Sequence, residues 1–341
     1  MTTPTPPSDQ NVADLVLEGG GVKGIALAGA VWAFDDERWT FPRVAGTSAG
    51  AMAGAVIAAL QAAGEPLSQV VELAKTLDYH KFRDRGFPGS WLGPLGVLTD
   101  PFSVVLEQGA YEGDYLHDWI RGVLADLGVH TFGDLRRDDP ADDGHIHHEY
   151  SLVVTASDIS RKRLVYLPWD YAEYGLDPDE QSVADAVRAS ASIPYFFEPV
   201  TLDGTRGRST LVDGGLLSNY PISAFDRLDD LPPRWATLGI RLDALGIGEE
   251  PPPEPVRNVV SMGIALIETA IEANQAEHVL DPCNVARSVY VDTRGVGAVD
   301  FSISDEEQRL LIERGREAGA EFLAKWDYDA WLKNCRPAWA R

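Results

Sequence analysis

Short apolar runs and longer amphipathic runs alternate along the first part of this chain. Residues 12–18 (VADLVLE) form a short apolar run that predicts a buried strand, and residues 22–37 have the periodicity of a helix. The pair then repeats, because residues 41–46 (FPRVAG) predict a second strand and residues 48–64 a second helix. Alternating strands and helices favour a parallel sheet, so the pattern predicts an α/β fold.

The middle of the chain continues this alternation. Residues 150–158 and 163–168 predict two strands that can form a hairpin. Residues 182–193 predict a helix that Pro194 stops, and residues 209–215 (STLVDGG) predict a strand that enters a tight turn. These segments therefore add strands and a helix to the same α/β arrangement.

The C-terminal part predicts a long helix over residues 256–279, a strand over 286–292 and a last helix over 305–325. Ser304 directly precedes the last helix and is its expected N-cap. Because no internal repeat or linker interrupts the chain, we predict one large α/β domain over residues 12–327.

Three segments fall outside this pattern. Residues 1–11 are rich in Pro and Thr and predict a disordered lead-in, and residues 328–341 are expected to form a C-terminal tail. Residues 85–100 (RGFPGSWLGPLGVLTD) carry Trp91 among glycines and prolines. This stretch could cover a cleft as a lid or pack into the core, and the sequence leaves both options open.

The net charge limits the range of partners. The 341 residues carry a formal net charge of −24, and so acidic a protein is a poor partner for nucleic acid, whose phosphates require clustered Lys and Arg. Anionic membranes repel it as well. We expect at most transient contact with a membrane surface, through a patch such as Lys81, Arg83 and Arg85.

Several absences shape the remaining expectations. No apolar run reaches the roughly 18 residues of a membrane span, and the first residues lack signal-peptide features, which predicts a cytoplasmic location. Cys283 and Cys335 could pair, but no disulfide framework surrounds them, and idle thiols are expected. The stretch DDPADDGHIHHE (138–149) fits neither an EF-hand nor a zinc spacing, so no metal site is expected.

The first chemical motif lies between the first predicted strand and helix. Gly19, Gly21 and Gly24 spell G-x-G-x-x-G, which is typical of a dinucleotide-binding loop or of another anion site at a helix N-terminus. A dinucleotide site would place an acidic residue at the end of the second strand, whereas the nearby acidic residues precede that strand. The loop therefore favours a different anion.

The second motif is GTSAG, residues 46–50, where the second predicted strand meets the second helix. G-x-S-x-G in this context is typical of a nucleophile elbow, a sharp turn that presents the Ser48 hydroxyl. Gly46 and Gly50 remove side chains that would collide in so tight a turn. Ser48 is therefore the candidate nucleophile.

The base that would activate Ser48 is less obvious. None of the seven histidines stands at a clear strand end, although a triad stays open because geometry and not sequence order defines it. Asp213 ends an apolar strand directly before Gly214 and Gly215, where a parallel sheet presents functional groups at its carboxyl edge. The alternative is that Asp213 and Gly214 only form a turn. The predicted elbow favours Asp213 as the partner of Ser48.

Taken together, these motifs resemble those of the patatin-like phospholipases. The matching pieces are GGGVKG (19–24), GTSAG (46–50) and DGG (213–215), in the order that the family has. RASASIPYFFEPV (188–200) and DFSISDEEQRLLIERGREAG (300–319) are also similar to segments of that family. Three ordered motifs are far more specific than any one of them.

The resemblance implies both a fold and a chemistry. It implies a three-layer α/β fold with a central, mostly parallel sheet between helices, and an acyl hydrolase that uses a Ser–Asp dyad without cofactor or metal. Ser48 would be the nucleophile, Asp213 the general base and the glycine-rich loop the oxyanion hole. The loop residues are Gly19, Gly20, Gly21, Lys23 and Gly24, with Gly20 and Gly21 as the main donors.

We therefore expect a hydrolase of lipid acyl esters, of the phospholipase A or lysophospholipase type. Three alternatives stay open: a soluble carboxylesterase, a binding module that keeps the fold without catalysis, and a nucleotide-binding oxidoreductase. The head group, the acyl position, the chain length and the oligomeric state do not follow from the sequence.

Overall fold

The computed structural model describes most of the chain. The described residues are 11–82, 101–137, 149–227, 233–243, 256, 262, 263, 265, 266, 269–271, 281–298 and 300–335, with backbone alone for 80, 82 and 101–112. The predicted lead-in, apart from Asn11, lies outside them, as do the stretch around Trp91 and the loop at 138–148. Within the predicted helix 256–279, residues 262, 263, 265, 266 and 269–271 are helical.

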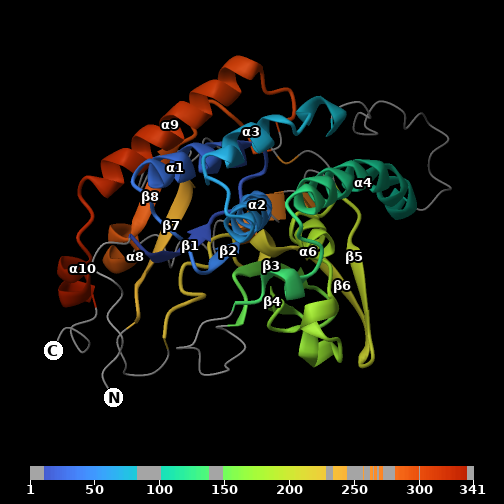
Figure 1. The fold of residues 1–341 in the computed structure, drawn as a ribbon. Coiled ribbons are helices and arrows are strands. Elements are labelled where there is room, and N and C mark those ends of the chain that lie inside the picture. The colour runs from blue at the N-terminus through green and yellow to red at the C-terminus, as the bar shows by residue number, and fades with distance from the viewer. Residues whose placement is uncertain are drawn as a thin grey trace.

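The described part of the chain forms a mixed sheet of eight strands, in the order β5-β6-β3-β2-β1-β7-β8, with β4 paired to β3 (Figure 1). The strands are β1 (Ala13–Leu17), β2 (Val44–Gly46), β3 (Leu152–Asp158), β4 (Arg163–Leu167), β5 (Val200–Gly204), β6 (Gly207–Asp213), β7 (Ala236–Asp243) and β8 (Ser288–Asp292). Strands β3, β2, β1, β7 and β8 are parallel neighbours, whereas β4, β5 and β6 pair antiparallel. The predicted α/β fold with a mostly parallel sheet is confirmed.

Helices flank this sheet, also as predicted. Their bounds are α1 (Ile25–Asp36), α2 (Ala49–Ala63), α3 (Gln69–Lys75), α4 (Pro101–Asp126), α6 (Val183–Ser190), α8 (Pro282–Ala286), α9 (Asp305–Leu323) and α10 (Tyr328–Cys335). Short 3₁₀ turns add η1 (Gly21–Gly24), η2 (Tyr79–Phe82), η5 (Phe132–Leu135), η6 (Tyr171–Tyr174), η7 (Pro178–Glu180) and η8 (Gly214–Leu216). Helices α1 and α9 pack on each other beside β7 and β8, and α2 packs on β1, β2 and β3 (Figure 1).

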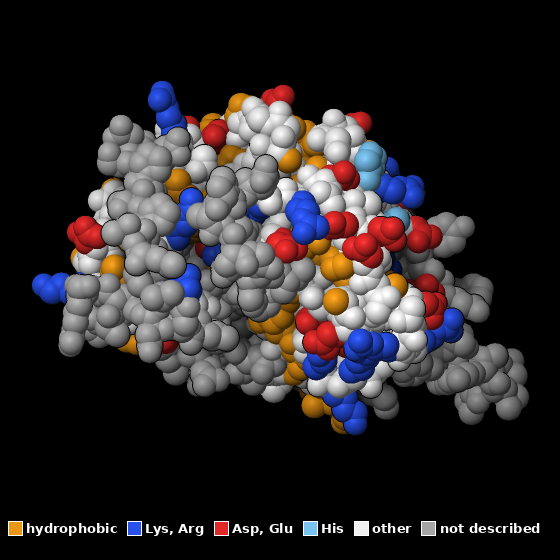
Figure 2. Space-filling model, turned by 60° about the horizontal axis from the view of Figure 1, so that its bottom comes forward, with side chains coloured by type: hydrophobic (Ala, Val, Ile, Leu, Met, Phe, Trp, Pro, Cys, Tyr) orange, Lys and Arg blue, Asp and Glu red, His pale blue; other side chains and the backbone are white. Residues whose placement is uncertain are grey.

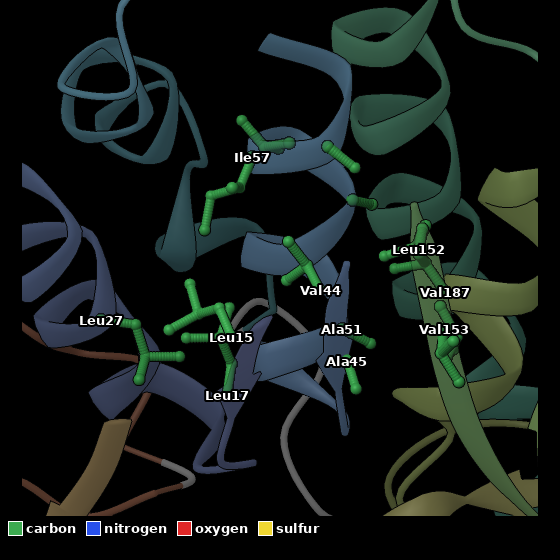
Figure 3. Packing of buried hydrophobic residues seen from close by; sticks show 14 of the residues in the cluster. Leu15, Leu17, Leu27, Val44, Ala45, Ala51, Ile57, Leu152, Val153 and Val187 are labelled. Atoms are coloured by element: carbon green, nitrogen blue, oxygen red, sulfur yellow. The ribbon is translucent and has the colours of Figure 1, made fainter. Parts of the chain in front are cut away.

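The core lies between the central strands and the helices above them. Leu15 and Leu17 of β1 and Val44 of β2 are fully buried, and they meet Leu27 of α1 and Ile57 of α2 (Figure 3). Helix α2 is rich in Ala and Gly, which lets its backbone approach β2 closely. This tight packing fixes the start of α2, and therefore the elbow before it, against the sheet.

The structure corrects three sequence expectations. Strands β5 and β7 were not predicted, and β6 runs antiparallel to β3 rather than as part of a parallel edge. The expected idle thiols are wrong, because Cys283 and Cys335 form a disulfide between α8 and α10. Helix α10 occupies the first part of the segment expected to be a tail, and its Trp331 is buried.

Two observations bear on whether the protein contacts or spans a membrane. Acidic and basic side chains are intermixed on the right-hand part of the face in Figure 2. Within the described residues, no helix combines the length and apolarity that a membrane-spanning helix needs.

The N-cap prediction for the last helix is confirmed, because Ser304 and Glu307 form a capping box at the start of α9.

Candidate active site

Ser48 stands in the sharp turn between β2 and α2. Its backbone has φ 53° and ψ −119°, a conformation that a non-glycine residue adopts only where its surroundings enforce it. A Cβ on Gly46 would clash with the carbonyl oxygen of Gly50, and a Cβ on Gly50 would clash with that of Leu17. The predicted reason for both glycines is therefore confirmed, and the strain identifies Ser48 as a residue held for presentation.

Side chains from other segments hold this turn. The Ser48 backbone N–H donates to the Ser190 hydroxyl at the end of α6, over 2.8 Å. The Thr47 hydroxyl lies 2.6 Å from the Thr155 hydroxyl of β3 and donates to the carbonyl oxygen of Ser218 at 3.0 Å. The elbow is thus bonded to α6, to β3 and to the segment that follows Asp213.

The register of β3 brings Asp213 to the same place as Ser48. Gly46 of β2 stands opposite Val154, and Asp213 of β6 stands opposite Ala156, two residues further along β3. The sequence argument assumed that Asp213 ends a parallel strand at the carboxyl edge of the sheet. Because β6 is antiparallel to β3, that assumption is wrong. Asp213 instead ends an antiparallel strand on one side of β3, and Gly46 ends β2 on the other side, so β3 lies between the two strands.

Asp213 is a buried carboxylate, only 5% exposed. Its Oδ1 accepts a hydrogen bond from the Gly215 N–H at 2.7 Å, and its own N–H donates to the Ser192 carbonyl at 2.9 Å. Oδ2 is buried and has no hydrogen-bond partner within the described part of the chain. One carboxylate oxygen therefore orients the group, and the other is open to accept a proton.

Burial raises the pKa of Asp213 to about 6, and the nearby Ser48 hydroxyl and Gly215 N–H lower it only in part. The carboxylate is thus ionised at neutral pH and a stronger base than an exposed aspartate. Ser48 and Asp213 are both buried, each 5% exposed. The assignment of Ser48 and Asp213 as a catalytic pair stays a prediction.

The glycine loop follows β1 directly and leads into η1. The Gly19 N–H donates to the Asn219 carbonyl at 3.0 Å, and the Asn219 side-chain amide returns a bond to the Gly19 carbonyl, also at 3.0 Å. The Lys23 N–H is engaged with the Gly20 carbonyl at 3.2 Å. The backbone N–H groups of Gly20 and Gly21 make no hydrogen bond to any described residue.

The backbone N–H groups of Gly20 and Gly21 are therefore the donors of this loop that can bind a ligand. Gly21 has φ 54°, in the left-handed region that favours glycine, and this turns the chain into η1 and α1. The N-terminal end of the helical segment η1–α1 adds a positive potential at the same place. Gly24, the N-cap of α1, packs against Ala49, the residue after Ser48.

Two contacts outside the motifs anchor this loop. The Glu18 carboxylate accepts a hydrogen bond from the Leu242 N–H at 2.6 Å and lies 3.2 Å from the Arg241 guanidinium. Glu18 directly precedes Gly19, so this buried pair fixes the end of β1 to β7. Sequence reasoning missed it because β7 was not predicted. It also missed Asn219 and Ser190, although Ser190 lies within the segment 188–200 that resembles the family.

Within the described residues, the structure joins no histidine to this site. His117 Nε2 lies 2.6 Å from Asp185 Oδ1, between α4 and α6. Among the described residues, no hydrogen bond connects a histidine to Ser48 or Asp213. The same residues contain no group of three or more His, Cys, Asp or Glu side chains arranged to hold a metal.

Comparison with known proteins bears on this geometry. A family model described as patatin-like phospholipase matches residues 15–226. The chain belongs to the patatin-like phospholipase family. The matched range includes the glycine loop, the elbow and Asp213, and proteins of this family are generally ester hydrolases.

Relatives of this patatin-like protein occur in Bacillus subtilis and in Mycobacterium bovis. It is 38% identical over 315 residues to the uncharacterized protein YqhO of Bacillus subtilis (strain 168), which covers 92% of this chain and 99% of that protein. It is 28% identical over 207 residues to Mb2594, an uncharacterized NTE family protein of Mycobacterium bovis, over 61% of this chain and 27% of that one.

The solved structure of VipD from Legionella pneumophila matches this patatin-like protein with a TM-score of 0.50. The match covers 93% of this chain and 67% of VipD, at 17% sequence identity. At this identity the likeness shows the fold alone. It agrees with the sheet and the flanking helices described above.

Proposed function

We propose that this patatin-like protein hydrolyses acyl esters of lipids, as a phospholipase A or lysophospholipase. The observation that carries the proposal is the pairing of a strained Ser48 with a buried Asp213 whose Oδ2 is open to accept a proton. The adjacent glycine loop supports the proposal, because the N–H groups of Gly20 and Gly21 make no hydrogen bond to the described residues and are available to an oxyanion.

The reaction would proceed in two halves. Asp213 accepts the Ser48 proton while Ser48 Oγ attacks the ester carbonyl, and the N–H groups of Gly20 and Gly21 stabilise the resulting oxyanion. Collapse of the tetrahedral intermediate releases the alcohol, which takes the proton from Asp213, and leaves an acyl ester on Ser48. Water, deprotonated by Asp213, then hydrolyses that ester and frees the fatty acid.

The test is covalent labelling with a fluorophosphonate, read by intact mass and peptide mapping. We expect one adduct, on Ser48, and no adduct in Ser48→Ala. A single adduct that survives in Ser48→Ala would overturn the assignment. Absence of labelling, also with lipid micelles present, would instead favour a binding module that keeps the fold.

A soluble carboxylesterase is the second candidate, because the net charge of −24 opposes adsorption to anionic lipid. Turnover measured below and above the aggregation threshold of a lysophospholipid separates the two. A jump above the threshold supports lipolysis at an interface with transient membrane contact, and equal specific activity supports the soluble esterase. No nucleic acid partner and no cofactor are part of either proposal.

A cytoplasmic location stays a prediction, and the Cys283–Cys335 disulfide weighs against it, since structural disulfides are typical of oxidising compartments. Trapping free thiols in intact cells before lysis tests this point. Two trapped thiols would support the cytoplasm, and two protected ones would support an oxidising compartment.

A further inference from the structure

The C-terminal end of α6 binds the backbones of both residues of the candidate pair, Ser48 and Asp213. The Ser190 hydroxyl, on the last residue of α6, accepts a hydrogen bond from the Ser48 N–H at 2.8 Å. The Ser192 carbonyl, directly after the helix, accepts one from the Asp213 N–H at 2.9 Å. The position of this helix end therefore bears on the positions of both residues.

Arg188 fixes this helix end through its side chain. Its Nη1 donates to the Ser192 hydroxyl at 2.5 Å, and that hydroxyl donates back to the Arg188 carbonyl at 2.7 Å. Its Nη2 donates to the backbone carbonyl of Glu198 at 3.2 Å. One guanidinium thus joins the last turn of α6 to Ser192 and to the segment that follows.

The guanidinium is buried at a cost in stability. Arg188 is 9% exposed, and burial lowers its pKa, an effect that Asp114 and Glu198 offset in part. Within the described residues, its side-chain hydrogen bonds go to a hydroxyl and a carbonyl oxygen, and not to a carboxylate. A buried charge without a bonded counter-ion does not stabilise a fold, so stability alone does not account for an arginine here.

Helix α4 covers the guanidinium and leaves room for it at one glycine. Helix α4 packs on α6 (Figure 1), and a Cβ on Gly113 would clash with the Arg188 guanidinium. The ring of Phe197 lies on the guanidinium as well, with its centroid at 5.7 Å. The side chain of Arg188 is therefore confined to the position in which it binds Ser192.

We propose that Arg188 is a positioning residue for the candidate pair, an inference that rests on the proposed hydrolase function. By holding Ser192, the guanidinium fixes the carbonyl that binds the Asp213 N–H. By fixing the end of α6, it also holds the Ser190 hydroxyl that binds the Ser48 N–H. Proton transfer between the pair requires hydrogen-bond reach, and a displacement of about 1 Å can lower the rate roughly a hundredfold.

The first test displaces the guanidinium without changing Arg188 itself. Gly113→Ala places a methyl group against the guanidinium, and Gly122→Ala makes the same change on α4 where a Cβ would meet nothing within 4 Å. Alanine is favoured over glycine in a helix, so both helices should form. We expect kcat on a short ester to fall roughly tenfold in Gly113→Ala with KM nearly unchanged. Gly122→Ala should keep the wild-type kcat.

Ser192→Ala is the second variant, and it keeps the carbonyl that binds the Asp213 N–H. It removes the hydroxyl that Arg188 binds, so we expect a loss of kcat similar to that of Gly113→Ala. Because both changes break one connection, the double variant should lose no more than either single variant. Additive losses, or an unchanged kcat in both single variants, overturn the positioning role while leaving hydrolysis at Ser48 intact.

Hydrogen exchange keeps the proposal independent of turnover. Mass spectrometry follows amide exchange in peptides that contain the N–H groups of Ser48 and Asp213. In Gly113→Ala and in Ser192→Ala, we expect both peptides to exchange roughly tenfold faster than in the wild type and in Gly122→Ala, because their acceptors are less firmly held. This result supports the positioning role even where the wild type hydrolyses no ester, which would contradict the proposed function alone. Unchanged exchange in both peptides overturns the positioning role.

Discussion

The edge of the sheet around Ser48 and the C-terminal corner around Cys335 are held by different kinds of contact. At the Ser48 edge, glycine backbones pack closely, Ser48 is strained and Asp213 keeps an unsatisfied buried oxygen. At the C-terminal corner, the Cys283–Cys335 disulfide joins α8 to α10, and Trp331 donates to the Cys283 carbonyl at 3.0 Å. The Ser48 edge therefore contains a strained residue and an unsatisfied buried oxygen, whereas a disulfide and a hydrogen bond cross-link the C-terminal corner.

The corner is further stabilised by a buried ion pair. The guanidinium of Arg287, whose side chain is 2% exposed, makes two hydrogen bonds to the Asp226 carboxylate, at 2.6 and 2.8 Å. It also lies over the Trp331 ring, 5.7 Å from the centroid. The comparison implies that substitutions at the Ser48 edge change turnover, whereas substitutions at the corner change stability.

Asp213→Asn should have the largest effect on turnover. Asn keeps the Oδ1 acceptor for the Gly215 N–H but cannot accept the Ser48 proton, so we expect kcat to fall about 10³- to 10⁴-fold.

In the wild type, kcat/KM should rise with pH through the Asp213 pKa of about 6 and level off above it. Initial rates from pH 4.5 to 8.5 check this, and a flat profile would contradict the base assignment.

Asp213→Asn should also stabilise the fold. Burial raises the pKa of Asp213 from 3.8 to about 6, so the folded state binds its proton more tightly than the unfolded state. Keeping the carboxylate ionised therefore costs stability, a cost that develops between about pH 4 and 6 and reaches about 3 kcal/mol above that window. Thermal unfolding should show Asp213→Asn more stable than the wild type at pH 8 and equal to it near pH 4. Equal stability at both pH values would sink this account.

Asn219→Ala should have an intermediate effect. It removes the side-chain bond to the Gly19 carbonyl and leaves the backbone bond from the Gly19 N–H, so the candidate oxyanion loop loosens but stays in place. We expect kcat to fall about 10- to 100-fold with KM nearly unchanged, because the loss is felt at the oxyanion. Steady-state kinetics on a short ester give this split; a rise in KM alone would show that Asn219 contributes to substrate binding instead.

Asn219→Asp refines that test. Aspartate keeps a side-chain oxygen and the size of asparagine but lacks the donor to Gly19, so it should lose as much kcat as alanine does. Wild-type turnover in Asn219→Asp would show that packing, and not the hydrogen bond, is what the loop requires.

The sequence predicted the parts of the Ser48 edge that depend on local backbone geometry. Glycines at 46 and 50 are needed by any strand-to-helix turn so tight, and Ser48 and Asp213 were proposed as nucleophile and base from turn motifs. The antiparallel direction of β6 was not predicted, because a strand shows its direction only through its partner. Asn219 and Ser190 were missed for the same reason: their roles lie in contacts with residues far away in the sequence.

The C-terminal corner was much less accessible to sequence reasoning. Two cysteines that are 52 residues apart carry no spacing motif, and only the packing of α10 on α8 brings their Cα atoms to 5.4 Å. Arg287 and Asp226 are likewise an ordinary cation and anion until the fold places both beside Trp331. A region that is defined by tertiary contacts alone has no local sequence pattern from which it can be predicted.

Cys335→Ser should have the smallest effect on turnover. Opening a loop of this length removes about 2 to 4 kcal/mol of stability, mainly through the entropy of the unfolded chain, while Ser48 and Asp213 keep their contacts. We expect a lower midpoint of urea unfolding and an unchanged kcat, and Cys283→Ser/Cys335→Ser should behave as the single variant does. If kcat falls together with the midpoint under conditions where the variant is fully folded, the corner and the Ser48 edge are mechanically coupled, and their division into a region for stability and a region for turnover is wrong.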